Sequence, residues 1–146
     1  MTSTEMTNIE SPAIKVIALV AHDNMKQEML EWATEHEIEL KRHILIATGS
    51  TGKLIADNTS LTPERLRSGP LGGDQQIGAR ISDGGVDVLL FFWDPLEPQP
   101  HDPDIRALLR IAVVWNIPVA CNRASADFIM SSPLLGAPYQ RRVPKY

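Results

Sequence analysis

The residues of this 146-residue chain whose types could do chemistry lie directly after its short apolar runs. Histidine, aspartate, lysine, hydroxyl and glycine residues fill these positions, which are the segments 21–26 (AHDNMK), 48–52 (TGSTG), 93–104 (WDPLEPQPHDPD) and 121–122 (CN). An apolar run that ends in a polar turn is typical of a parallel strand, and the carboxyl ends of parallel strands meet along one edge of a sheet. We therefore expect these side chains to converge on one site that combines acid–base and anion-binding groups.

The segment 48–52 is a glycine-rich turn between a predicted strand and a predicted helix. Its hydroxyl groups and the N–H groups at the helix start suit a phosphate, and Lys26 could add a cation. The turn is neither a Walker loop, which needs Gly-Lys-Ser/Thr, nor a GxGxxG motif. The alternative is an ordinary turn in which Ser50 or Thr51 caps the helix and Lys26 is a solvated surface residue. The spacing alone leaves both interpretations open.

A second glycine-rich segment, residues 68–76 (SGPLGGDQQ), leads into another predicted helix. Asp74 in this segment is either a helix N-cap, for which aspartate is among the best residues, or a carboxylate general base. Gly69, Gly72 and Gly73 are more glycines than a cap requires, and they suggest a backbone that packs close to a ligand.

His101 lies in a proline-rich loop, just before residues 102–103 (DP), which are typical of a helix N-cap with proline at the first helical position. A histidine there is either a surface residue or a general acid or electrophile, since its side chain titrates near neutrality. Asp104 either hydrogen-bonds to His101 or favours the helix dipole. The same two interpretations apply to His22, which stands beside Asp23. No two histidines have metal-ligand spacing, so no metal site is expected.

The hydrophobic pattern predicts alternating strands and helices. Strands are expected at 14–20, 43–47, 86–93 and 118–121, with one short strand near 65–66, and helices at 24–41, 51–58, 74–82, 105–115 and 125–131. Residues 1–12 are expected to be a flexible tail, residues 13–146 one domain, and its end from 133 onward irregular. Nearly all-apolar strands indicate a sheet covered on both faces. The predicted fold is therefore α/β: a doubly wound three-layer αβα sandwich with a mainly parallel sheet of about five strands.

The composition excludes several classes of protein. With 14 basic and 18 acidic residues the net charge is −4, which argues against a nucleic-acid-binding or membrane-binding surface. Cys121 is the only cysteine, so a disulfide framework or a cysteine-based zinc site within one chain is excluded. No run approaches the roughly 18 apolar residues of a membrane helix and no signal peptide is recognised. We therefore expect a soluble cytoplasmic protein.

Six segments together resemble the methylglyoxal synthase family. They are 21–27 (AHDNMKQ), 47–55 (ATGSTGKLI), 68–79 (SGPLGGDQQIGA), 86–96 (VDVLLFFWDPL), 100–122 (PHDPDIRALLRIAVVWNIPVACN) and 126–129 (ADFI), and the resemblance runs from about residue 14 to residue 133. It implies a sheet similar to Rossmann and flavodoxin-like folds and a homohexamer. It also implies conversion of dihydroxyacetone phosphate to methylglyoxal and inorganic phosphate, inhibition by phosphate, and no metal or organic cofactor.

The resemblance also implies roles for individual residues. Asp74 matches the catalytic base, and His101 and Asp104 complete the expected catalytic group. The positions that bind substrate or phosphate match His22, Lys26, Thr48, Gly49, Ser50, Thr51, Ser68 and Gly69, and the supporting acidic residues match Asp23 and Asp94.

The chain departs from the family pattern at two places. Ser50 stands where many members have threonine, which keeps the hydroxyl group. The family also implies a further arginine beyond a segment that resembles residues 143–146, and Arg141 and Arg142 lie upstream of that segment and do not match it.

The main alternative is a related non-catalytic domain that senses a phosphorylated effector. Such a domain shares the phosphate cradle but has no need of a base and an acid, so Asp74, His101 and Asp104 favour the enzyme. A nucleotide-binding flavodoxin-like protein is the third interpretation. It is the weakest, because nothing beside the cradle offers aromatic stacking for a base or a flavin.

Overall fold

A parallel sheet of five strands forms the centre of the computed structural model, which describes residues 5–145. The strands are β2 (Val16–Ala21), β3 (Ile44–Ala47), β4 (Glu64–Arg65), β5 (Val88–Phe92) and β6 (Val119–Ala120), and their order across the sheet is β4-β3-β2-β5-β6. The direction of winding reverses between β2 and β5. In open α/β sheets, ligands bind in the crevice at the carboxyl ends of the strands at such a reversal.

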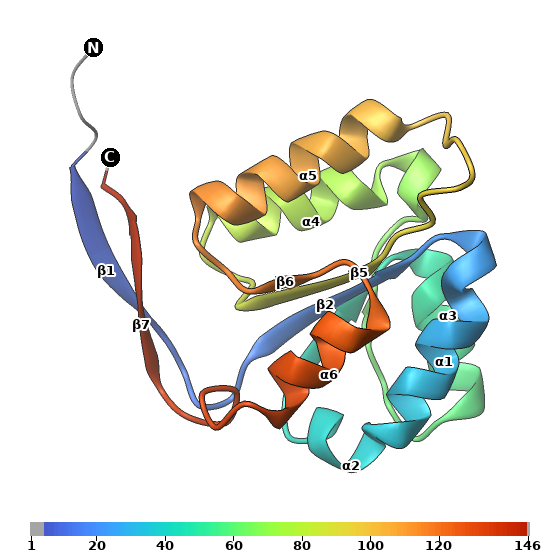
Figure 1. The fold of residues 1–146 in the computed structure, drawn as a ribbon, viewed down its shortest axis with the longest axis horizontal. Helices are drawn as coiled ribbons and strands as arrows, with labels where there is room; N and C mark the ends of the chain where they lie inside the picture. The colour runs from blue at the N-terminus through green and yellow to red at the C-terminus, as the bar shows by residue number, and fades with distance from the viewer. Residues whose placement is uncertain (1–4, 146) are drawn as a thin grey trace.

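Helices cover both faces of this sheet (Figure 1). One face carries α4 (Gly73–Ser82) and α5 (Asp102–Val114), and the other carries α1 (Lys26–Glu35), α3 (Gly49–Asn58) and α6 (Arg123–Ser131). Three short helices, η1 (Asp23–Met25), α2 (Glu37–Leu40) and η2 (Gly69–Leu71), complete the helical set of the described residues.

Two apolar cores hold the helices on the sheet, and β2 contributes to both because successive side chains of a strand point to opposite faces. Ile17 and Leu19 belong to the core under α1, α3 and α6. Ala18 and Val20 belong to the core under α4 and α5. The predicted three-layer αβα sandwich with a five-stranded parallel sheet is confirmed.

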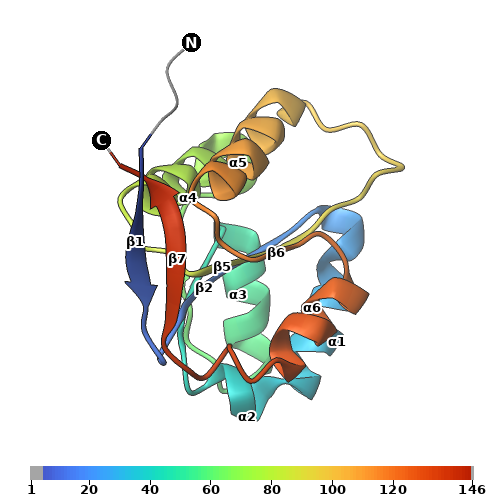
Figure 2. The ribbon, with the colours of Figure 1, turned by 60° about the vertical axis from the view of Figure 1, so that its left-hand side comes forward.

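A second, two-stranded sheet leaves the body of the molecule (Figures 1 and 2). Strand β1 (Met6–Ser11) pairs antiparallel with β7 (Tyr139–Pro144), and Met6 lies opposite Pro144. The predicted flexible tail and irregular end are therefore wrong for these residues, while residues 1–4 of the predicted tail lie outside the described part of the chain. Pairing gives these polar segments backbone partners for their N–H and C=O groups. We call β1 and β7 together the ribbon.

Arg141 ties the ribbon to the body. Its guanidinium group is buried, donates through Nε to Ser11 Oγ at 2.8 Å, and donates through Nη1 to the carbonyl oxygen of Trp115. The amide of Asn116 adds a hydrogen bond to the carbonyl oxygen of Arg142 at 3.2 Å. A charged side chain inside the protein is stable only with such partners, so the ribbon and the end of α5 fix each other.

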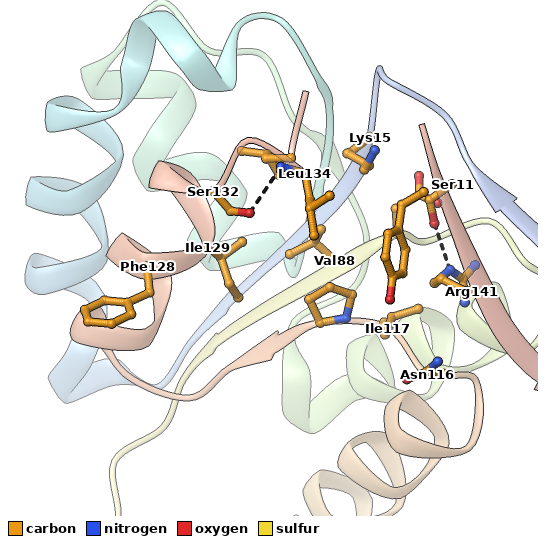
Figure 3. Close-up of a pocket in the computed structure, with 14 residues that line it drawn as sticks. Ser11, Lys15, Val88, Asn116, Ile117, Phe128, Ile129, Ser132, Leu134 and Arg141 are labelled. Atoms are coloured by element: carbon orange, nitrogen blue, oxygen red, sulfur yellow. Dashed lines mark hydrogen bonds between the residues drawn. The ribbon is translucent and has the colours of Figure 1, made fainter. Parts of the chain in front are cut away.

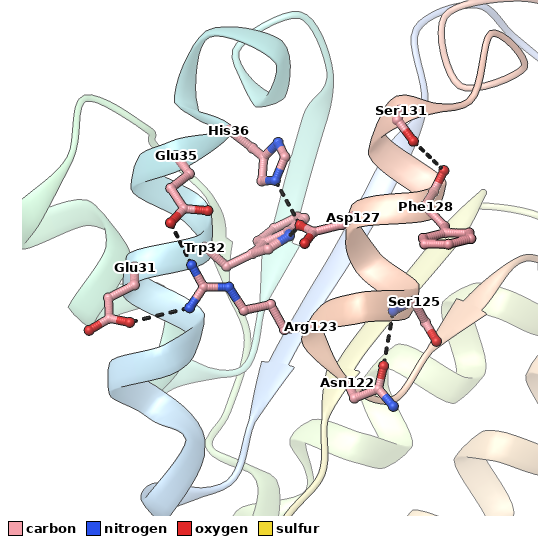
Figure 4. A network of polar contacts seen from close by, with 10 residues as sticks. All are labelled: Glu31, Trp32, Glu35, His36, Asn122, Arg123, Ser125, Asp127, Phe128 and Ser131. Carbon is pink, nitrogen blue, oxygen red and sulfur yellow. Dashed lines mark hydrogen bonds and ion pairs between the residues drawn. The ribbon is translucent and has the colours of Figure 1, made fainter.

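The single helix predicted over 24–41 is divided into η1, α1 and α2, and the break between the last two falls at His36. His36 Nε2 lies 3.0 Å from Asp127 Oδ1 of α6, and Trp32 Nε1 donates to the same oxygen at 3.1 Å (Figure 4). Arg123 pairs with two glutamates of α1 nearby. These contacts hold α6 against α1 where the helix path turns.

Replacing the buried arginine of the ribbon tests its role. Arg141→Ala removes two hydrogen bonds from a charged donor, and we expect the free energy of unfolding to fall by about 2–3 kcal/mol. Arg142→Ala changes the neighbouring exposed residue of the same strand, and we expect a change within about 0.5 kcal/mol. Urea unfolding at one fixed protein concentration measures both values, and equal losses in the two variants would contradict this role.

Candidate active site

The polar residues that follow β2, β3 and β5 surround one cavity at the carboxyl edge of the sheet. Its lining residues are Val20, Ala21, His22, Asp23, Lys26, Thr48, Ser50, Gly69, Pro70, Asp74, Gln99 and His101. Eight of these are predicted site residues, namely His22, Asp23, Lys26, Thr48, Ser50, Gly69, Asp74 and His101. The other predicted residues, Gly49, Thr51, Ser68, Asp94 and Asp104, do not line the cavity.

Asp74 stands in the first turn of α4 and is buried. The helix starts at Gly73 after Gly72, whose φ of 105° is left-handed, and no side-chain bond caps it, so the N-cap interpretation of Asp74 is wrong. Both carboxylate oxygens lack a hydrogen-bond partner within residues 5–145. Burial raises the pKa of Asp74, while His101 opposes the shift and Asp104 adds to it. A buried carboxylate without partners is costly, and a carboxyl with a raised pKa suits a general base.

His101 faces this carboxylate, with its Nε2 atom 3.6 Å from Asp74 Oδ2. The predicted cap at residues 102–103 is wrong by one position, because Asp102 is already the first residue of α5 and His101 precedes the helix. Asp104 donates its backbone N–H to the carbonyl oxygen of His101 at 2.9 Å. This bond seats the histidine on the first turn of α5, and the carboxylate of Asp104 acts on Asp74 through its charge.

Glycine at position 69 leaves room between His101 and Asp74. A Cβ atom there would lie 3.2 Å from His101 Nε2 and 3.5 Å from Asp74 Oδ1. Gly73 has a different task, since a Cβ atom on it would lie 2.1 Å from the carbonyl oxygen of Arg67. The segment 67–69 therefore packs directly against the start of α4, which brings Gly69 over the Asp74 carboxylate.

The start of α3 forms part of the wall of the same cavity. The helix begins at Gly49 after Thr48 and has no side-chain cap bond, so the expected caps at Ser50 and Thr51 are wrong. Thr48 and Ser50 line the cavity. Thr51 is fully buried, and its hydroxyl oxygen accepts the N–H of Ala21 at 3.2 Å, so it links α3 to the end of β2 instead. First-turn N–H groups and the helix dipole attract anions.

Lys26 supplies a positive charge beside this wall. Its Nζ atom donates to the carbonyl oxygen of Ala21 at 2.6 Å and lies 3.3 Å from Asp23 Oδ1. The lysine side chain is 21% exposed while the Asp23 side chain is 98% exposed. A surface pair of this kind contributes little to stability, so the ammonium group remains available to an anion in the cavity.

His22 and Asp94 meet where β2 and β5 end. His22 Nδ1 accepts the backbone N–H of Asp94 at 3.0 Å, and His22 Nε2 is buried without a partner among the described residues. Burial lowers the pKa of His22, and the neighbouring His101 lowers it further. Asn24 Nδ2 donates to Asp94 Oδ2 at 2.9 Å, which is the main cause of the lowered pKa of Asp94. Asp94 therefore supports His22 from outside the cavity.

Gln99 is a lining residue that the sequence analysis missed. It lies two residues before His101 in the proline-rich loop, and its Nε2 atom donates to the carbonyl oxygen of Glu97 at 3.2 Å. Only its closeness to His101 in the sequence could have indicated this, because a glutamine in a loop belongs to no motif.

Ser68 was expected at the cavity but does not line it. Its backbone carbonyl oxygen accepts the N–H groups of Leu71 and Gly73.

Metal-ligating clusters and membrane-spanning helices are two further features that could define a site in residues 5–145. No cluster of three or more His, Cys, Asp or Glu side chains in this range is arranged to hold a metal ion. No helix in this range is both long enough and apolar enough to cross a membrane.

Comparison with known proteins gives a consistent result. A model of the MGS-like domain matches residues 28–121. The methylglyoxal synthase of Saccharophagus degradans is 62% identical over 135 residues, covering 92% of this chain and 88% of that protein, and that of Cellvibrio japonicus is 61% identical over the same shares. The crystal structure of methylglyoxal synthase from Elizabethkingia anophelis superposes with a TM-score of 0.91 at 49% identity, covering 96% of this chain and 92% of that one.

The matches to the two curated relatives and to the solved structure each extend over more than nine tenths of the chain. They agree with the resemblance seen in the sequence motifs and with the order of the five parallel strands. The chain therefore belongs to the methylglyoxal synthase family, whose members are lyases.

Proposed function

We propose that this chain converts dihydroxyacetone phosphate to methylglyoxal and inorganic phosphate, with Asp74 as the general base. One observation carries the proposal: a buried carboxylate without hydrogen-bond partners among the described residues lies 3.6 Å from a histidine. Both groups line a cavity that is also lined by the start of a helix and by a lysine. A base, a hydrogen-bond donor and an anion site are the groups that this reaction requires.

The reaction begins at the hydroxymethyl carbon of the substrate. Asp74 takes one proton from this carbon, and the electrons of the broken C–H bond form an enediolate with the neighbouring carbonyl group. His101 donates a hydrogen bond to the carbonyl oxygen as negative charge develops on it. Gly69 supports this step, because its missing side chain leaves space for the reacting atoms beside both groups.

The second step releases phosphate. The hydroxyl group on the deprotonated carbon loses its proton and becomes a carbonyl, the C=C bond shifts toward the carbon that bears the phosphate group, and the C–O bond there breaks so that phosphate leaves with its electron pair. The enol that remains takes up a proton on its terminal carbon, gives up the proton on its oxygen and becomes methylglyoxal. This elimination requires the C–O bond to stand perpendicular to the plane of the enediolate, so the position of the phosphate group decides the outcome. A dry cavity protects the enediolate from side reactions.

The phosphate group is held by Lys26 and by the start of α3 in this proposal. The ammonium group of Lys26, the hydroxyl groups of Thr48 and Ser50 and the first N–H groups of the helix all suit a dianion. Inorganic phosphate fits the same groups. We therefore propose that it is an inhibitor of the reaction as well as one of its products. A domain that only senses a phosphorylated effector would need only these phosphate-binding groups. The presence of Asp74 and His101 in the same cavity therefore favours the lyase.

We also propose that copies of the chain associate, as the homohexamer that the family resemblance implies. Isolated two-stranded sheets are marginally stable in water, and the ribbon extends from the body (Figure 2). A second cavity lies between the ribbon and α6, far from Asp74, and exposed Phe128 and Leu134 stand at it (Figure 3). Clustered exposed apolar residues support an interaction surface there.

A cytoplasmic location is proposed as well, supported by the free thiol of Cys121.

Asp74→Asn tests the base. We expect kcat to fall by about 10²–10⁴-fold, the usual contribution of a general base, while the affinity for inorganic phosphate stays close to that of the unmodified protein. Released phosphate and methylglyoxal are measured together, and phosphate binding is measured by calorimetry. Asp83→Asn, at the exposed end of the same helix, is the matched control and should leave activity unchanged. Loss of phosphate binding together with activity would make Asp74 a structural residue.

Gly69→Ala tests the space between acid and base. The added methyl group would stand 3.2 Å from His101 Nε2, a contact that requires the imidazole to move by a few tenths of an ångström, and we expect this misplacement to lower kcat/KM by roughly tenfold. Gly136→Ala is the control, because a Cβ atom there meets nothing within 4 Å. Equal kcat/KM in the two variants would show that the space above Asp74 is not used.

The raised pKa of Asp74 predicts how stability depends on pH. Burial favours the neutral acid in the folded state, so the stabilisation is present below the unfolded-state pKa of about 3.9 and is lost as the pH rises through the folded-state value. Asp74→Asn keeps a neutral side chain at every pH. We therefore expect it to raise the free energy of unfolding more at pH 7 than at pH 4, measured by urea unfolding. An equal change at both pH values would contradict a raised pKa.

A further inference from the structure

An exposed asparagine at the edge of the site reaches the cavity through two hydrogen-bonded groups. Asn24 Nδ2 donates to Asp94 Oδ2 at 2.9 Å, and the backbone N–H of Asp94 donates to His22 Nδ1 at 3.0 Å. We propose that Asn24 is a positioning residue which, through Asp94, keeps the ring proton of His22 on Nε2, where it faces the substrate. This inference rests on the proposed function for its kinetic part only.

The bond from Asp94 fixes which ring nitrogen of His22 carries the proton. Nδ1 accepts an N–H, so it bears no proton, and the single proton of a neutral imidazole then lies on Nε2. Nε2 is buried and has no partner within residues 5–145, and His22 lines the cavity. A buried N–H without a partner is costly, and a substrate oxygen in the cavity would satisfy it.

The groups around His22 keep it neutral. Burial lowers its pKa most and His101 lowers it next, and the opposing charges of Asp94 and Asp102 do not reverse this direction. A proton added to Nδ1 would also confront the N–H of Asp94, so two donors would face each other. His22 is thus a neutral hydrogen-bond donor beside His101, at a distance of 6.1 Å between ring centroids.

Asp94 needs Asn24 to hold this N–H in place. The carboxylate of Asp94 accepts the N–H of Leu96 at 3.0 Å through Oδ1, which closes a turn at the start of the loop that carries His101. Its other oxygen, Oδ2, accepts the Asn24 amide, and the backbone N–H of Glu97 also donates to this carboxylate. Asn24 therefore joins this turn to η1, directly after His22. Since Asn24 itself is exposed, its side chain adds nothing to the apolar core, and its loss leaves the fold intact.

The test uses Asn24→Asp and Asn24→Ala in the full chain. Asn24→Asp is nearly isosteric, but it removes the Nδ2 donor and places a second carboxylate beside that of Asp94. Asn24→Ala removes the same donor without adding charge. Asn58→Asp is the matched control, because it removes an exposed amide-to-carbonyl bond at the far end of α3 and adds the same charge. The tautomer of His22 is observed by two-bond ¹H–¹⁵N correlation NMR of the imidazole rings, and kcat/KM is measured with dihydroxyacetone phosphate.

We expect the unmodified protein and Asn58→Asp to show a single Nε2–H tautomer of His22. Both Asn24 variants should show a mixture or a protonated ring, with kcat/KM lowered roughly threefold to tenfold, the effect of one hydrogen bond of ordinary strength. An unchanged tautomer in both variants would overturn the proposal, and so would a changed tautomer with unchanged kcat/KM. If the unmodified protein made no methylglyoxal, the proposed function would fail while the NMR result still decided the role of Asn24 in orienting His22.

Discussion

Burying the carboxylate of Asp74 without a hydrogen bond is the constraint around which the rest of the site is arranged. The backbone segment 67–69 supplies the cover, because Gly73 allows it to approach the start of α4 more closely than any side chain would permit. The free energy that this burial costs is met by the apolar cores on both faces of the sheet. In return the pKa of the carboxyl is raised, which suits the base proposed for a weakly acidic C–H proton.

The site divides along the sheet according to charge. His22 and His101 follow β2 and β5, at the reversal of winding, and α4 brings Asp74 to them, while Thr48 and Ser50, which suit a phosphate, lie at the start of α3 after β3. Thr51 and Asp94 show that several polar residues of the family motifs lie just outside the cavity and hold its walls. A substrate with a carbonyl at one end and a phosphate at the other matches this separation.

Much of this arrangement could be predicted from the sequence, and the errors have physical causes. Strong apolar runs marked the sheet strands to within about two residues, and the polar residues after them do converge. Helix starts were predicted too late, because the first turns of α3 and α5 contain glycine, serine, proline and aspartate rather than the apolar residues that reveal a helical period. The N-cap interpretations failed for the same reason. Gln99 was missed because only the folded loop brings it to the cavity.

The ribbon could not be predicted because its stability comes from pairing between segments at opposite ends of the sequence, and neither strand has an apolar pattern of its own. This long separation has a consequence for folding. Paired residues in the central sheet are between 18 (Ile46 and Glu64) and 71 (Ile17 and Val88) positions apart, whereas β1 and β7 meet only by closing nearly the whole chain. Loop-closure entropy therefore makes the ribbon the last element to form. It is also expected to open first, so that its amide protons exchange with solvent while those of β2 and β5 remain protected.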